Sequence, residues 1–147
     1  MPTADEANRL PLAIEFFTRA NEFLQAFRDL PSQAPPDWPR YLMLSHATEL
    51  ALKAYLLLRG MPEDELWQKF GHDLEKLQRR STELGLPIES LAADIEALNE
   101  AHMNNWLRYP KSESYKRVAT VDQFETCVQQ VFNAVHSAIY EKKRSRA

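Results

Sequence analysis

The chain has 147 residues, of which 44% are hydrophobic and 10% aromatic, enough apolar material for one domain with a real core and too much for an intrinsically disordered chain. Eighteen basic residues against 21 acidic ones leave a formal net charge of −3, which excludes strong nonspecific attraction to nucleic acid by bulk charge. The single cysteine, Cys127, excludes an intrachain disulfide and a thiolate metal cluster.

Prolines and glycines divide the chain into five segments, each with helical periodicity, so we expect an all-α fold. Four prolines between residues 31 and 39 predict a connection, and Gly60 and Gly85 lie where helices would end in a left-handed residue. We expect one domain over 1–147, with a core at about 10–141 and a basic tail at 142–147.

The first predicted helix ends near Leu30 and begins at Ala4 or at Pro11, because Pro11 either kinks a longer helix or starts a shorter one. The second, over 37–59, is apolar nearly all round and is expected at the centre of a bundle. Its most apolar stretch, 41–58, is about long enough to suggest a membrane span, but it contains His46, Glu49 and Lys53, each costing several kcal/mol in hydrocarbon. The N-terminus also lacks the apolar core of a signal peptide, so we expect a cytoplasmic protein with no membrane segment.

Three shorter patterns follow. The segment 73–84 predicts a charged helix with one leucine edge, and 88–107 predicts a helix that buries Leu91, Ile95, Leu98 and Trp106. The last helix is expected from Thr120, whose spacing to Gln123 fits a capping box, to about residue 143. Its apolar residues recur at alternating spacings of three and four, which predicts a bundle seam.

The central helix carries one polar stripe, formed by His46, Glu49 and Lys53 within an arc of about 60°. The stripe could be a ligand-contacting edge or a charge network buried at an interface. It could also face solvent, or Glu49 and Lys53 could simply pair as an i, i+4 couple.

The loop before the third predicted helix contains His72 and Asp73. Asp73 is well placed as the N-cap of that helix. His72 could contact a phosphate or a carboxylate, or it could only fasten the loop.

The most promising binding segment is Arg108-Tyr109-Pro110. A guanidinium fork beside an aromatic ring suits a phosphate or a base, and Lys111, Lys116 and Arg117 would add positive potential. The alternative is a helix end with ordinary solvated charges.

Other chemistry has weaker support. His102 lies on an apolar stripe and is expected to be a packed core histidine, and Cys127 lies on an apolar helix face and is expected to be an inert thiol. Metal binding is not expected, because the four histidines are isolated in the sequence and none pairs with another at i, i+4. No glycine-rich phosphate loop or nucleophile elbow is found, so no cofactor is expected.

Three motifs together resemble the HEPN domain family: residues 46–56 (HATELALKAYL), Gly71-His72-Asp73-Leu74, and Arg108-Tyr109-Pro110. The resemblance covers about residues 14–140. It implies an up-and-down bundle of four or five helices, usually a homodimer, from a bacterium or archaeon. Some members of the family are metal-independent ribonucleases, often toxins neutralised by a small nucleotidyltransferase partner.

The ribonuclease members carry an arginine followed four to six residues later by histidine, and this chain departs from that pattern. After Arg108 the next histidine is His136, and the spacing of Arg40 and His46 is interpreted as a coincidence. We therefore expect a dimeric binding module for a nucleotide or RNA phosphate, or for a nucleotidyltransferase-type partner. Arg108 would hold the phosphate and Tyr109 would stack, with His72 and Lys53 as secondary contacts.

A metal-independent endoribonuclease of the toxin–antitoxin type is the alternative, and no catalytic residue is assigned from the sequence. In that case a histidine from another helix, or from a second subunit, would have to approach Arg108. A purely structural helical bundle is the third interpretation.

Overall fold

The computed structural model describes residues 4–34, 37–103 and 120–146, and these ranges contain helices and no strand. Two long helices come first, α1 (Ala4–Asp29) and α2 (Trp38–Leu58). Three shorter ones follow, α3 (Glu63–Lys69), α4 (Leu74–Glu83) and α5 (Ala92–Met103), and then the long α6 (Glu125–Arg146). Single 3₁₀ turns precede α5 (Glu89–Leu91) and α6 (Val121–Phe124).

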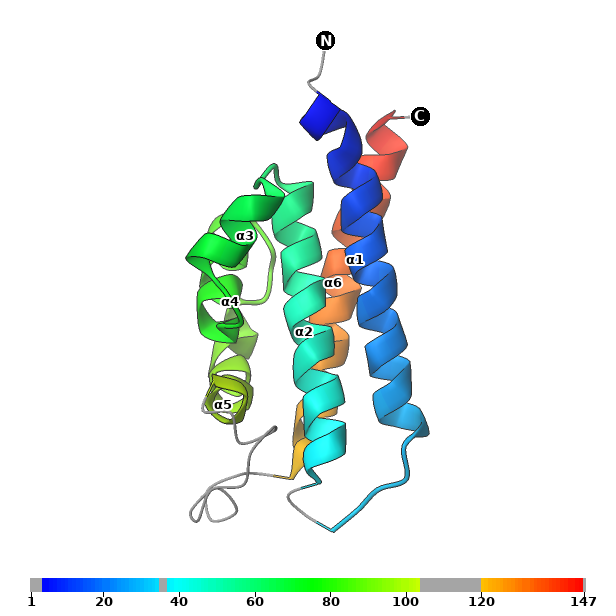
Figure 1. The fold of residues 1–147 in the computed structure, drawn as a ribbon, viewed down its shortest axis with the longest axis vertical. Helices are drawn as coiled ribbons and strands as arrows, with labels where there is room; N and C mark the ends of the chain where they lie inside the picture. Colours follow the sequence, from blue (N-terminus) through cyan, green and yellow to red (C-terminus); the bar gives the residue numbers. More distant parts are fainter. Residues whose placement is uncertain (1–3, 35–36, 104–119, 147) are drawn as a thin grey trace.

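Helix α2 is the centre of the bundle. It packs against α1 and α6 on one side and against α3, α4 and α5 on the other (Figure 1). Most of its residues are buried, which confirms the central position expected from its apolar composition. No described helix is long and apolar enough to cross a membrane.

The predicted seam on the last helix is confirmed. Buried side chains recur at the alternating spacing that the sequence indicates, and they face α2 and its neighbours. They are Val121, Phe124, Cys127, Val128, Val131, Phe132, Val135 and Ile139.

Both glycines expected at helix ends adopt the left-handed conformation. Gly60 has φ +101° and Gly85 has φ +105°. After α2, Met61 N–H donates to the Leu56 carbonyl and Gly60 N–H donates to the Leu57 carbonyl, and the same two bonds recur after α4. These are Schellman motifs, which satisfy the last carbonyls of each helix.

The helix boundaries differ from the expected ones in several places. Helix α3 was not expected at all, because Leu66 is its one buried residue and leaves no apolar stripe to detect. Helix α1 continues through Pro11 from Ala4, which settles the two alternatives for its start. The expected capping box at Thr120 is wrong: its side chain makes no cap hydrogen bond, and a 3₁₀ turn precedes α6.

A buried arginine ties the α1–α2 connection to the start of the last helix. The side chain of Arg40 is only 8% exposed and donates to Asp37 at 3.2 Å and to Asp122 at 2.9 Å. Its guanidinium also lies 4.3 Å from the centre of the Phe27 ring and donates to the Phe27 carbonyl. This network was missed in the sequence because its partners lie on three separate segments.

Removing this guanidinium should destabilise the protein strongly. Arg40→Ala leaves the Asp37 carboxylate, itself 4% exposed, without its positive partner, and we expect a loss of about 3–5 kcal/mol in the free energy of unfolding. Urea denaturation followed by circular dichroism measures it. The matched control is Arg19→Ala, which breaks the exposed Arg19–Glu15 pair and should cost less than about 0.5 kcal/mol. Equal losses in the two variants would contradict the role of Arg40.

Candidate functional site

The candidate site is built around one buried carboxylate, that of Glu49 in the middle of α2. Its Oε2 accepts a hydrogen bond from Lys53 Nζ at 3.0 Å. Its Oε1 accepts from His102 Nε2 at 2.9 Å, and His72 Nδ1 lies 3.0 Å from Oε1 and 3.1 Å from Oε2. Because an ionised carboxylate only accepts, both ring nitrogens must carry hydrogen in this arrangement. We call these four residues the Glu49 cluster.

The members of the cluster are positioned by α2, by α5 and by the turn that precedes α4. Lys53 lies one turn after Glu49 on α2, and His102 is the penultimate residue of α5. His72 immediately precedes Asp73, which caps α4 by accepting from the backbone N–H groups of Glu75 and Lys76. The predicted N-cap role of Asp73 is thereby confirmed.

A second contact locks the two histidine-bearing segments together. Asn99, one turn before His102 on α5, donates to Asp73 Oδ1 at 3.0 Å and accepts from the backbone N–H of Leu74 at 2.8 Å. These two bonds fix the start of α4 against α5. The positions of His72 and His102 relative to each other are therefore set by hydrogen bonds outside the cluster itself.

The cluster is buried at one end and open at the other. The side chains of Lys53, Glu49 and His102 are 0%, 1% and 5% exposed, whereas that of His72 is 51% exposed. The sequence-based expectation of a packed core histidine holds for the burial of His102, but its ring also bonds the carboxylate.

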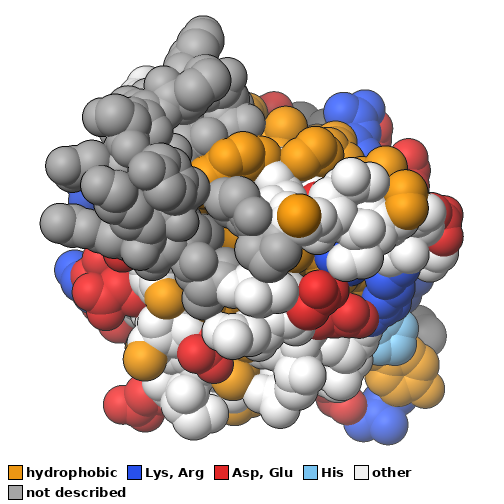
Figure 2. Space-filling model, turned by 90° about the horizontal axis from the view of Figure 1, so that it is seen from below, with side chains coloured by type: hydrophobic (Ala, Val, Ile, Leu, Met, Phe, Trp, Pro, Cys, Tyr) orange, Lys and Arg blue, Asp and Glu red, His pale blue; other side chains and the backbone are white. Residues whose placement is uncertain are grey.

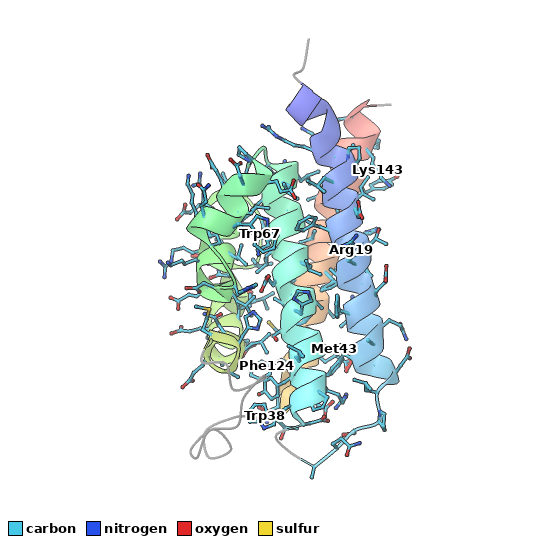
Figure 3. All side chains as sticks on the ribbon, in the orientation of Figure 1. Arg19, Trp38, Met43, Trp67, Phe124 and Lys143 are labelled. Atoms are coloured by element: carbon cyan, nitrogen blue, oxygen red, sulfur yellow. The ribbon has the colours of Figure 1, made fainter. Side chains whose placement is uncertain are left out.

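An exposed tryptophan borders the open end. The Lys53 ammonium lies 4.1 Å from the centre of the Trp67 ring, and the His72 ring meets Trp67 edge-on with centroids 6.4 Å apart. Trp67 comes from α3 and lies toward α2 (Figure 3). It is nevertheless 51% exposed, so an indole and an imidazole are both accessible at this point of the surface.

The donors around Glu49 change its acidity. Burial alone would raise the pKa of this carboxyl, but the hydrogen bond from His102 and the charge of Lys53 act in the opposite direction. The hydrogen bonds from His72 and Lys53 add to them, and together they lower the pKa to about 2. Glu49 is therefore a carboxylate throughout the physiological pH range.

The charges of the cluster act on His46, but its ring makes no hydrogen bond to any of the four members. Burial lowers the pKa of its imidazole, with the Glu49 carboxylate opposing that effect. Its ring packs edge-on against Phe23 of α1, with centroids 4.5 Å apart. Of the three residues in the predicted polar stripe, Glu49 and Lys53 thus form a buried pair, and His46 lies against α1.

The structure brings together some sequence-predicted residues and leaves others aside. Glu49, Lys53 and His72 meet in the cluster, while Arg108 and Tyr109 lie outside the described residues. The ammonium of Lys53 is directed to Glu49 and Trp67 and not to solvent. Trp67 was missed because the helix that carries it was missed.

Two histidines that are far apart in the sequence lie together in the structure. Two of the four histidines, isolated in the sequence, share one carboxylate in space: the ligand-type atoms of Glu49, His72 and His102 all lie within 4.8 Å of one another. By contrast Cys127 is buried, and burial raises the pKa of its thiol to about 11, in agreement with the expected inert thiol.

A hollow lies at the N-terminal end of α2. It is lined by residues of the α1–α2 connection and the first turn of α2, including Leu30, Trp38 and Arg40. Figure 2, which views this end of the bundle, shows hydrophobic side chains among charged groups of both signs. Here Arg40 is already bonded to two carboxylates, so the Glu49 cluster is the stronger candidate.

Neutralising Glu49 should give a characteristic pH dependence. Because the folded pKa of about 2 lies below the ordinary 4.5, the ionised form stabilises the fold above pH 4.5, and this contribution is lost as the pH falls toward 2. We expect Glu49→Gln to cost about 3–5 kcal/mol at pH 7, with the gap to the parent protein narrowing between pH 4.5 and 2. Urea denaturation across this pH range measures it.

Two controls accompany that measurement. Glu89→Gln, at an exposed position, should cost little at any pH. If Glu49→Gln does not fold, Glu49→Gln/Lys53→Met, which removes both buried charges, should recover much of the stability. A pH-independent gap would contradict an ionised Glu49.

The described part of the site is thus a buried carboxylate with three cationic or imidazole donors, one of which, His72, reaches the surface beside an exposed indole. Neither a protein-family model, nor a curated protein, nor a solved structure matches this chain.

Proposed function

We propose that this chain is a HEPN-like helical-bundle protein that binds a phosphate-bearing nucleotide or a single-stranded RNA at the open end of the Glu49 cluster. One observation carries the proposal: a half-exposed imidazole, His72, stands beside a half-exposed indole, Trp67. An aromatic face for a base next to a hydrogen-bond donor for a phosphate is a recurrent arrangement in proteins that bind single strands.

The burial pattern supports different roles for the two ends of the cluster. Lys53 covers one face of the Trp67 ring, but about half of the Trp67 surface remains exposed and is available to a base. His72 Nδ1 donates to Glu49, which leaves Nε2 free to donate to a phosphate oxygen when the ring is in its protonated form. Glu49 and Lys53 therefore position the exposed pair and do not themselves contact the ligand.

The resemblance to the HEPN family supports the rest of the proposal. In this proposal the chain forms a homodimer, and a nucleotidyltransferase-type protein is a possible partner. Arg108 and Tyr109 keep the roles of phosphate fork and stacking ring that the sequence motif indicates.

Binding should depend on the exposed indole. We expect Trp67→Ala to weaken the binding of a fluorescently labelled single-stranded RNA by roughly 5- to 150-fold, because stacking on one aromatic ring contributes about 1–3 kcal/mol per base. Fluorescence anisotropy at constant salt measures the affinity. Tyr140→Ala is the control, since Tyr140 is equally exposed (57%) but lies on α6, across α2 from the site. Equal affinities for all three proteins would contradict the proposal.

A second function, metal-independent ribonuclease, is favoured by one contact. An exposed imidazole held through Nδ1 by a buried carboxylate is the arrangement of an oriented general base. In this mechanism His72 would take the proton of a 2′-hydroxyl as it attacks the adjacent phosphate, and Arg108 would stabilise the developing charge.

Cleavage in excess EDTA distinguishes the two functions. The ribonuclease proposal expects cyclic-phosphate ends from labelled RNA or tRNA, at least a 100-fold slower rate in His72→Ala, because general acid–base catalysis contributes about 10²–10⁴-fold, and loss in Arg108→Ala. His136→Ala, an exposed histidine on α6, should cleave at the parent rate. Binding without cleavage at high protein concentration would leave the binding module and reject the enzyme.

A further inference from the structure

We propose that Glu49 Oε1, His72 Nδ1 and His102 Nε2 form a binding site for a divalent transition metal ion, with Zn²⁺ as the best match. Two imidazole nitrogens and one carboxylate oxygen are a donor set that Zn²⁺ commonly takes, in three-ligand sites that keep one position open. The proposal stands on the cluster's own geometry and does not rest on nucleic-acid binding.

The three donor atoms lie close enough together for small side-chain movements to bring them onto one shared ion. His102 Nε2 and His72 Nδ1 lie 2.9 and 3.0 Å from the same oxygen of Glu49, and the three atoms lie within 4.8 Å of one another. Two ligand atoms of a tetrahedral zinc centre are about 3.3 Å apart when each bond is about 2.0–2.1 Å. To hold one ion in place of the two ring hydrogens, the carboxylate oxygen must move a few tenths of an ångström away from each nitrogen. Rotation of the imidazole rings must also bring the two nitrogens, which lie within 4.8 Å of each other, to about the same 3.3 Å spacing.

The surroundings hold the donors in place. Lys53 Nζ holds the other carboxylate oxygen, Oε2, so the metal would take Oε1 alone, and a donor on the remaining oxygen is a typical outer-shell contact for a ligating carboxylate. The Asn99–Asp73 and Asn99–Leu74 bonds join α5 to the start of α4. These contacts hold the segments that carry the donors, and the metal would not disturb them.

The burial of the donors indicates where the fourth position lies. Glu49 and His102 are 1% and 5% exposed and close the inner side, whereas His72 is 51% exposed. The open coordination position therefore lies on the solvent side, next to Trp67, where water or a small anion can complete a tetrahedron.

The test is a direct titration of the metal. Purified full-length protein, freed of metal with EDTA and then of EDTA by gel filtration, is titrated with Zn²⁺ by calorimetry and with Co²⁺ by visible absorption. We expect saturation at one ion per chain, Co²⁺ bands of tetrahedral intensity, and a higher melting temperature with Zn²⁺. His72→Ala should weaken Zn²⁺ binding by at least about tenfold.

Two further variants make the result decisive. His72 is half-exposed, so His72→Ala should keep the parent far-UV circular dichroism spectrum; His102→Ala is the second ligand variant and should also lose affinity. His136→Ala removes an exposed histidine outside the cluster and should bind Zn²⁺ as the parent does. No saturable binding, or binding unchanged in both His72→Ala and His102→Ala, would overturn the proposal.

Discussion

The burial of one carboxylate in the most apolar helix of the protein is the constraint on which the rest of the arrangement depends. Glu49 is 1% exposed on α2, and an ionised carboxylate at such a position is tolerated only when donors surround it. Lys53 comes from the same helix, but His72 and His102 must be brought in by the α3–α5 side of the bundle. The packing of that side against α2 is therefore coupled to the ionisation of one residue.

This coupling favours one alignment of α4 and α5 against α2. Apolar contacts have no fixed direction, whereas a carboxylate with several fixed donors is satisfied in one alignment. Asn99 has the same effect between α5 and the start of α4, and Arg40 has it between the α1–α2 connection and the start of the last helix. Polar contacts thus align elements that the hydrophobic core alone would only bring together.

The two functional proposals use one imidazole in compatible ways. With no metal bound, His72 Nδ1 donates to Glu49, and the protonated ring can donate from Nε2 to a phosphate. With a metal bound at Nδ1, the open coordination position would lie beside the same exposed indole of Trp67. Both proposals therefore place the binding of an anionic group beside the exposed indole of Trp67. The buried members of the cluster act by positioning and charge, and the exposed ones make the contacts.

Local patterns in the sequence were enough to determine the all-α class, the central helix, the seam of α6, the left-handed glycines and the Asp73 cap, because each depends on residues within a turn or two of one another. Helix α3 could not be predicted in this way, because its single buried residue, Leu66, gives no periodic pattern. The site itself was decided by tertiary structure: the two histidine partners of Glu49 lie 23 and 53 residues away, and their rings converge on it only when α2, α4 and α5 pack. Spacing along the chain identifies neighbours on one helix, whereas the Glu49 carboxylate joins residues of α2, α5 and the turn before α4.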